Sequence, residues 1–175
     1  VVTGAEKLPS SLSDAFEEKF GVRPVEGYGT TELSPLVSVN IPASRSGEHD
    51  EVDCKEGTVG RPVMGVRAKA VDLDTGEDLP AGQSGMLHVA GSNVMKGYMG
   101  RDDLTRDVIK DGWYVTGDVA YLDEDGFITI TGRESRFSKI GGEMVPHIKV
   151  EDELNGLLEA DEEGGPKIAG TAVPD

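Results

Sequence analysis

The chain has 175 residues, of which 37% are hydrophobic, and this is enough for one domain with a buried core. Its 33 acidic and 17 basic residues give a formal net charge of −16, which excludes nucleic acids and anionic lipid surfaces as expected partners because their phosphates are repelled. A single cysteine, Cys54, excludes an internal disulfide and favours a reducing, cytoplasmic location.

The first 39 residues have the pattern of an α/β unit, in which short apolar runs alternate with one helical period. In chain order, we expect a strand at 1–3, a helix capped by Ser10 or Ser11 and stopped by Gly21, a strand around Val25, a turn at 28–32 and a strand at 36–39. Residues 40–57 are polar and aperiodic, which is typical of a solvated loop.

From residue 57 to residue 133 the pattern changes to that of β-structure, with apolar residues at every second position and frequent glycines. We expect strands at 66–70, 86–90, 119–122 and 127–130, a hairpin loop at 123–126 and one helix at 102–109. The strand at 86–90 is apolar on both faces, so we do not expect it at an exposed edge.

The last 42 residues, 134–175, have mixed character. We expect a strand at 137–140, a turn at Gly141-Gly142, a helix from about Pro146 to Leu158 and a final strand at 167–173. The chain lacks an initiator Met and ends in a strand-like run, so we expect an excised fragment of α/β class, more strictly an α+β piece. Any attachment of the parent protein to the inner membrane would then be made through regions outside this chain.

Three short stretches carry groups suited to a nucleotide. They are Tyr28-Gly-Thr-Thr-Glu32, Tyr114-Val-Thr-Gly-Asp118, and Gly132-Arg133 followed by Lys139. Together they offer an aromatic face for a base, hydroxyl and carboxylate oxygens for phosphate, metal and ribose, and cations for developing negative charge. Because the net charge opposes the binding of ATP, such a site needs local cations or Mg²⁺.

With Gly4-Ala-Glu-Lys-Leu-Pro9 and Gly57-Thr-Val-Gly-Arg-Pro62, these stretches resemble, in order, core motifs of the acyl-adenylate-forming superfamily. That superfamily, also called AMP-binding, includes acyl-CoA synthetases, peptide-synthetase adenylation domains and luciferases. Within it, residues 27–40 and 136–145 look most similar to the acyl-[acyl-carrier-protein] synthetase part of 2-acylglycerophosphoethanolamine acyltransferase.

The resemblance implies roles for individual residues. The implied nucleotide-binding residues are Gly4, Ala5 and Glu6 on one wall of the adenine pocket, Tyr28 and Gly29 on the other, Thr31 at the α-phosphate, Asp118 at the ribose hydroxyls and Arg133 at ribose and phosphate. The implied catalytic residues are Thr31, Glu32 as the Mg²⁺ ligand, and Lys139 just beyond an interdomain hinge. Many members place Asp or Lys at that hinge, whereas this chain has Ser135 followed by Arg136.

Each assignment has a structural alternative. The alternatives are an ordinary turn for Gly4, a half-buried packing role for Tyr28, a helix start with an acidic first turn for Thr31 and Glu32, an ion pair between adjacent strands for Asp118 and Arg133, and a solvated strand lysine for Lys139. Residues 123–126 are interpreted as a hairpin turn rather than a calcium loop, because the distal ligand positions are missing.

The resemblance also divides the chain. Residues 1–56 would be the C-terminal part of an α/β adenine-binding subdomain, 57–133 a β-rich, barrel-like subdomain, and 134–175 a truncated C-terminal lid. The parent would use ATP and Mg²⁺ to convert a fatty acid to acyl-AMP and transfer it to the thiol of acyl carrier protein. The alternatives are a medium- or long-chain acyl-CoA ligase and a non-catalytic nucleotide-binding module.

The family's phosphate loop and its catalytic lysine would lie before Val1 and after Asp175, so we expect the fragment alone to be inactive. The short segment 134–175 would either move relative to the rest or be held by a second copy of the chain, giving a homodimer.

Overall fold

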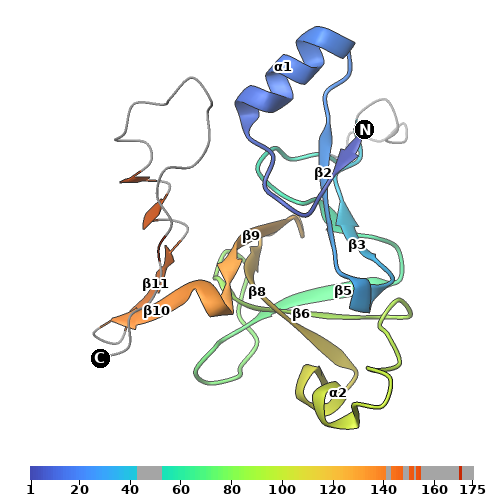
Figure 1. Ribbon diagram of the computed structural model, residues 1–175, viewed down its shortest axis with the longest axis vertical. Helices are drawn as coiled ribbons and strands as arrows, with labels where there is room; N and C mark the ends of the chain where they lie inside the picture. Colours follow the sequence, from blue (N-terminus) through green and yellow to red (C-terminus); the bar gives the residue numbers. More distant parts are fainter. Residues whose placement is uncertain (43–52, 141–142, 148–149, 152, 155–169, 171–175) are drawn as a thin grey trace.

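The structure is a computed structural model that describes residues 1–42, 53–140, 143–147, 150–151, 153–154 and 170. Its elements, in chain order, are β1 (Val2–Thr3), α1 (Ser10–Phe20), β2 (Val25–Gly29), the 3₁₀ helix η1 (Thr31–Leu33), β3 (Leu36–Val39), β4 (Arg61–Pro62), β5 (Val66–Val71), β6 (Gly85–Gly91), α2 (Asp102–Val108), β7 (Ile109–Lys110), β8 (Trp113–Leu122), β9 (Ile128–Arg133), the 3₁₀ helix η2 (Glu134–Arg136), β10 (Phe137–Ile140) and β11 (Glu143–Pro146). Figure 1 shows α1 and α2 at opposite ends of a sheet-rich molecule, so the expected mixed α/β class is confirmed.

The N-terminal part is a four-stranded sheet in the order β1-β2-β3-β4, in which only the β1–β2 pair is parallel. The helix α1 connects these two parallel strands, as a crossover connection requires. Gly21 ends it as expected, in the left-handed conformation with its N–H on the carbonyl of Glu17. The predicted serine cap is wrong, because Pro9 holds the N-cap position and no side chain caps the helix.

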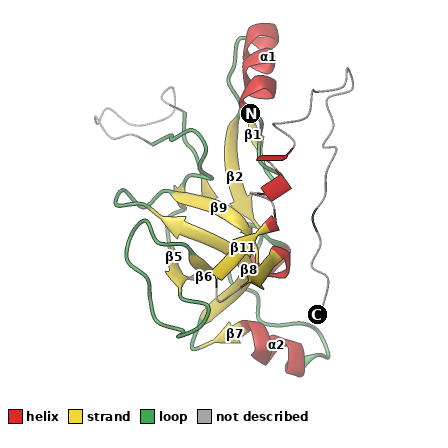
Figure 2. Cartoon of the chain, turned by 90° about the vertical axis from the view of Figure 1, so that its left-hand side faces the viewer, coloured by secondary structure: helices red, strands yellow, loops and turns green. Residues whose placement is uncertain are grey.

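The β-rich part is a curled sheet in the order β5-β6-β8-β7, with β9 paired to β8 (Figure 2). The expected strands, the central place of β6 and the helix near 102–109 are confirmed. One apolar cluster joins this sheet to the N-terminal part, because Leu33 and Val37 pack with Leu87, Val89 and Ile128. The two parts therefore share a core.

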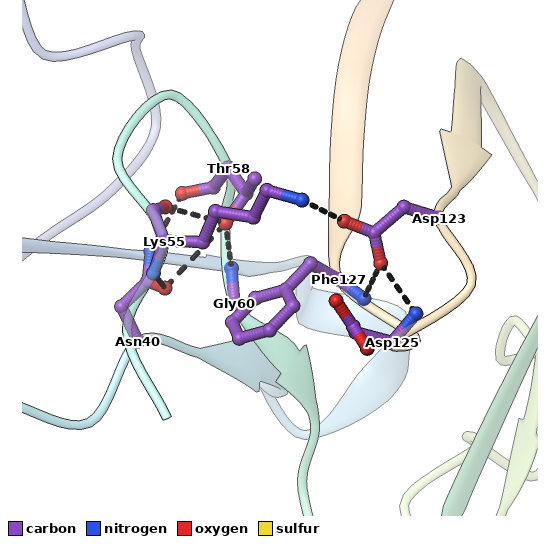
Figure 3. A network of polar contacts seen from close by, with 7 residues as sticks. All are labelled: Asn40, Lys55, Thr58, Gly60, Asp123, Asp125 and Phe127. Atoms are coloured by element: carbon purple, nitrogen blue, oxygen red, sulfur yellow. Dashed lines mark hydrogen bonds and ion pairs between the residues drawn. The ribbon is translucent and has the colours of Figure 1, made fainter. Parts of the chain in front are cut away.

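A polar network also ties these parts together (Figure 3). Asn40 is only 3% exposed; its Nδ2 donates to the carbonyl of Thr58 over 2.6 Å and its Oδ1 accepts the N–H of Lys55 over 2.9 Å. The predicted solvated loop over 40–57 is therefore wrong for Asn40, which is buried. Residues 43–52 of that segment lie outside the described residues.

The hairpin between β8 and β9 is held by Asp123, which confirms the interpretation of 123–126 as a turn. One carboxylate oxygen accepts the N–H groups of Asp125 and Phe127, and the other pairs with Lys55 over 2.5 Å (Figure 3). Both oxygens of the first residue of the supposed calcium loop are therefore engaged within the protein.

Beyond η2, β10 and β11 form an antiparallel hairpin with Ser138 opposite Val145. Pro146 is the last residue of β11 and not part of a first helical turn, and the described helical residues begin at His147. The side chain of Arg136 pairs with Glu151, which also accepts the N–H of Gly170. The rest of the expected strand 167–173 lies outside the described residues. Among the described helices, none has both the length and the apolar character needed to cross a membrane.

Candidate functional site

The segment Tyr28–Glu32 runs from the end of β2 into a tight turn. A Cβ atom at Gly29 would lie 1.8 Å from the carbonyl oxygen of Pro35, so only glycine lets the chain fold back this closely. Ser34 adopts a left-handed conformation and its N–H bonds to the carbonyl of Thr31, which closes η1. The turn thus presents Thr31 and Glu32 directly beyond the end of the strand that carries Tyr28.

Asp118 lies close to Tyr28 although 90 residues separate them. The Tyr28 hydroxyl group donates to Oδ2 of Asp118 over 2.5 Å, and Asp118 is only 5% exposed. Burial and the negative charge of Asp118 raise the pKa of Tyr28 well above its usual value, so this phenol is a donor. The structure therefore brings the predicted adenine-binding and ribose-binding residues together.

The structural alternative for Asp118 and Arg133, an ion pair between adjacent strands, is present. The two residues are directly opposite in the β8–β9 register, and Nε of Arg133 lies 3.1 Å from Oδ1 of Asp118. The Arg133 side chain is 70% exposed, so it can turn toward a ligand at small cost. A carboxylate has about four lone-pair sites, and the two bonds to Tyr28 and Arg133 leave acceptor capacity for the hydroxyl groups of a ribose.

A register shift in β8 sets the direction of the Asp118 side chain. Met86 and His88 of β6 lie opposite Val119 and Val115 of β8, so β8 has extra residues between these two pairs. One of them, Gly117, has a positive φ of 77°. The Thr116 hydroxyl group donates to the carbonyl of Leu87 over 2.9 Å and accepts the N–H of Asp118 over 3.0 Å. Bulges of this kind redirect side chains, and here the bulge turns Asp118 toward β2.

Glu32 has two partners in the loop after β6. Its carbonyl oxygen accepts the N–H of Met95 over 2.7 Å, and its Oε1 accepts the hydroxyl group of Tyr98 over 2.9 Å. Burial and the bond to Glu32 raise the pKa of Tyr98. Sequence reasoning missed Tyr98. A signal was present, because Gly97 and Gly100 lie close to this aromatic residue in the sequence. Gly27 and Gly29 lie beside Tyr28 in a similar way.

The remaining predicted residues lie at the margin. Gly4 follows β1 and adjoins β2, since a Cβ atom there would lie 3.1 Å from the carbonyl oxygen of Gly27. Ala5 and Glu6 are exposed beyond it, and Ala5 has a φ of 73°. Lys139 lies in β10 opposite Met144, and its side chain lies outside the described part of the structure. These roles therefore stay predictions.

The donor groups fit one kind of metal site. Among the described residues, no group of three His, Cys, Asp or Glu side chains could enclose a metal ion. Mg²⁺ is commonly held by one or two carboxylates together with water and substrate phosphates. Glu32, which follows Thr31 in η1, therefore suits a cation whose other ligands would be water and substrate phosphates.

A cavity of about 870 Å³ adjoins this cluster, since Tyr98 is among the residues that line it. Tyr114, Thr116, His88 and Trp113 also line it. Burial, and then the positive charge of Lys69, lower the pKa of His88. The surroundings of this imidazole therefore favour its neutral form.

Comparisons with known proteins agree with this geometry. The family described as AMP-binding enzyme matches residues 1–99. A long-chain-fatty-acid–CoA ligase of Salmonella typhimurium is 41% identical over 149 residues, which are 85% of this chain and 25% of that protein. A 3-methylmercaptopropionyl-CoA ligase of Ruegeria lacuscaerulensis is 38% identical over 158 residues, 86% of this chain and 28% of that protein. The chain thus spans about a quarter of the length of these relatives.

Solved structures show the same likeness. ATP-bound MatB from Rhodopseudomonas palustris superposes with a TM-score of 0.74 at 30% identity, covering 91% of this chain and 30% of MatB. O-succinylbenzoate coenzyme A synthetase from Bacillus subtilis, in complex with ATP and magnesium ion, gives a TM-score of 0.71 at 30% identity, with 87% of this chain and 30% of that one covered.

Proposed function

Because the chain belongs to the AMP-binding enzyme family, we propose that the intact protein containing it activates a fatty acid with ATP and transfers it to a thiol. In the first step, a carboxylate oxygen of the acid attacks the α-phosphorus of ATP, the bond to the bridging oxygen breaks, and pyrophosphate leaves. In the second step, the thiol sulfur attacks the acyl carbon and loses its proton, and AMP leaves.

The residues of this chain would bind and orient the nucleotide. Asp118 would accept the ribose hydroxyl groups, and the ring of Tyr28 would lie against the adenine. Arg133 would turn from Asp118 toward ribose or phosphate, because a guanidinium group on an exposed stem loses little by moving. Mg²⁺, when bound, would neutralise charge on the phosphates, with Glu32 as its protein ligand.

One observation supports this proposal more than any other. Tyr28 of the N-terminal sheet bonds to Asp118 of β8, although they belong to motifs far apart in the sequence. Tyr114 of β8 is close enough to interact electrostatically with both Tyr28 and Glu32. A purely structural ion pair needs Asp118 and Arg133, but it does not need a tyrosine from another sheet on the same carboxylate. The arrangement suits a ligand that has both a flat base and a vicinal diol.

For the thiol acceptor we propose coenzyme A, because the relatives named above are CoA ligases. Acyl carrier protein is the second candidate, favoured by the resemblance of residues 27–40 and 136–145 to an acyl-carrier-protein synthetase. The test supplies the intact protein with ATP, Mg²⁺ and a fatty acid, and then with CoA or holo-acyl carrier protein. Thioester formed with CoA alone supports the first choice, and thioester formed with the carrier protein alone reverses it.

Two further alternatives have tests of their own. A non-catalytic nucleotide-binding module would bind ATP and release no AMP with any acid and thiol. The homodimer expected from the short segment 134–175 would appear as a concentration-dependent mass in sedimentation equilibrium of the 175-residue chain. A mass equal to 18.6 kDa at every concentration would contradict it.

A further inference from the structure

Tyr98 lies outside every motif quoted above, yet it contacts the carboxylate proposed to hold the metal. Its hydroxyl group donates a hydrogen bond to Oε1 of Glu32 over 2.9 Å, across 66 residues of sequence. Burial raises the pKa of the phenol of Tyr114, on β8, and the nearby Glu32 and Tyr98 raise it further. Glu32 is therefore bordered by two phenol groups, and Tyr98 is the one that donates to it.

The segment that carries Tyr98 also holds the backbone of the turn. Nδ2 of Asn93 donates to the carbonyls of Leu33 and Leu36, over 3.0 and 3.1 Å. The N–H of Met95 donates to the carbonyl of Glu32 over 2.7 Å. Because residues 93–98 bind both the backbone and the carboxylate, Glu32 is fixed at two points by one segment.

Tyr98 is itself held from α2. Its backbone N–H donates to Oγ1 of Thr105 over 2.9 Å, and that hydroxyl group donates in turn to the carbonyl of Arg101 over 3.1 Å. Gly97, with a φ of 145°, brings the chain so close that a Cβ atom there would lie 2.9 Å from both Oγ1 and Cγ2 of Thr105. The backbone that carries the phenol is thus held against α2.

We propose that Tyr98 is a positioning residue for Glu32: it fixes one carboxylate oxygen so that the carboxylate keeps a single orientation toward a nucleotide-bound Mg²⁺. This inference rests on the proposed function of the site. Groups that hydrogen-bond to metal-binding carboxylates commonly set their orientation and affinity. A phenol suits this role because it donates without bringing a positive charge that would repel the cation.

The test measures binding rather than turnover. The intact protein is titrated calorimetrically with α,β-methylene-ATP, once with excess Mg²⁺ and once with EDTA. The ratio of the two Kd values gives the gain in affinity due to the metal. Tyr98→Phe removes only the hydroxyl group and should reduce that gain by about tenfold, a typical effect of losing such a partner. The Kd in EDTA should not change.

Two matched comparisons separate positioning from loss of structure. Thr105→Val removes the hydroxyl group that holds the Tyr98 backbone and should reduce the metal-dependent gain, whereas Thr105→Ser keeps that hydroxyl group and should preserve it. Tyr121→Phe, at the other end of β8, should leave both Kd values unchanged.

An unchanged gain in Tyr98→Phe would overturn the role of Tyr98, and so would an equal loss of affinity with and without Mg²⁺. Wild-type protein that binds the analogue without any gain from Mg²⁺ would overturn the proposed metal role of Glu32, and the role of Tyr98 with it.

Discussion

The hydroxyl group of Tyr28 donates a hydrogen bond to Oδ2 of Asp118 over 2.5 Å and so links the N-terminal sheet to the β-rich sheet. On the opposite side of the same carboxylate, Arg133 approaches Oδ1 over 3.1 Å. The two contacts differ in burial. The phenol bond lies among half-buried groups, whereas most of the guanidinium side chain is in solvent.

This difference predicts unequal contributions to stability. In the 175-residue chain, Tyr28→Phe should lower the free energy of unfolding by about 1.5–3 kcal/mol, because it removes a hydrogen bond to a charged acceptor. Arg133→Gln should lower it by about 1 kcal/mol or less, since exposed ion pairs contribute little. Urea denaturation of both variants is the measurement, and a larger loss for Arg133→Gln would contradict the burial argument.

Asn40 should be important for holding the segment that leads from β3 into β4. Asn40→Ala removes the partner of the Thr58 carbonyl and of the Lys55 N–H in a buried place, which should lower the free energy of unfolding by about 2–3 kcal/mol. Lys55→Gln removes the ion pair with Asp123, but the lysine side chain is 47% exposed. We therefore expect the free energy of unfolding to fall by about 1 kcal/mol or less. Thermal unfolding of the two variants under the same conditions compares them directly.

Gly57 and Gly60 form a matched pair of left-handed glycines, with φ of 78° and 83°. A Cβ atom at Gly60 would lie 2.0 Å from the backbone of Val39, whereas one at Gly57 has no atom within 4 Å. Gly57→Ala should therefore lower the free energy of unfolding only by the conformational penalty, about 1–3 kcal/mol. Gly60→Ala should lower it by more than about 4 kcal/mol or prevent folding. Equal unfolding free energies for the two variants would contradict the packing seen at Gly60.

The lowered pKa of His88 predicts a pH dependence of stability. The folded state favours the neutral imidazole, so the contribution of His88 is fully present above its unfolded pKa of about 6.5 and is lost as the pH falls below that value. Between about pH 7.5 and about pH 5, we expect the free energy of unfolding to decrease less in His88→Gln than in the wild type. The carboxylates are the same in both proteins, so the difference between them reports on His88. An identical pH dependence in the two proteins would show that His88 protonates as easily in the folded state as in the unfolded one.

Most strands could be predicted because their signals are local. Alternation at 66–70 and the turn at 123–126 depend on residues that are neighbours in the chain, and the structure has both features. The start of α1 could not be predicted so well, because two serines and a proline compete for the cap and the proline occupies it. Asn40 looked like a loop residue because its polar side chain gives no sign of partners at Lys55 and Thr58.

The residues of the candidate site also differ in how far the sequence could predict them. Tyr28, Glu32 and Asp118 could be found because each lies in a motif of characteristic spacing. Tyr98 could not be assigned from the sequence, because its role depends on a loop that returns from β6 to a turn 66 residues earlier. The ion pair between Asp118 and Arg133 depends on strand register, which the sequence leaves open.

The central claim is that Asp118 and its neighbours bind the nucleotide of an acyl-adenylating enzyme. The most direct measurement is fatty-acid-dependent exchange of pyrophosphate into ATP by the intact protein, in wild type and in Asp118→Asn, with saturating Mg²⁺. We predict exchange in the wild type and, in Asp118→Asn, a KM for ATP raised by about tenfold or more, because bonds to a charged acceptor contribute about 1.5–3 kcal/mol each. Exchange with an unchanged KM for ATP in Asp118→Asn would contradict the account and leave Asp118 a structural partner of Arg133.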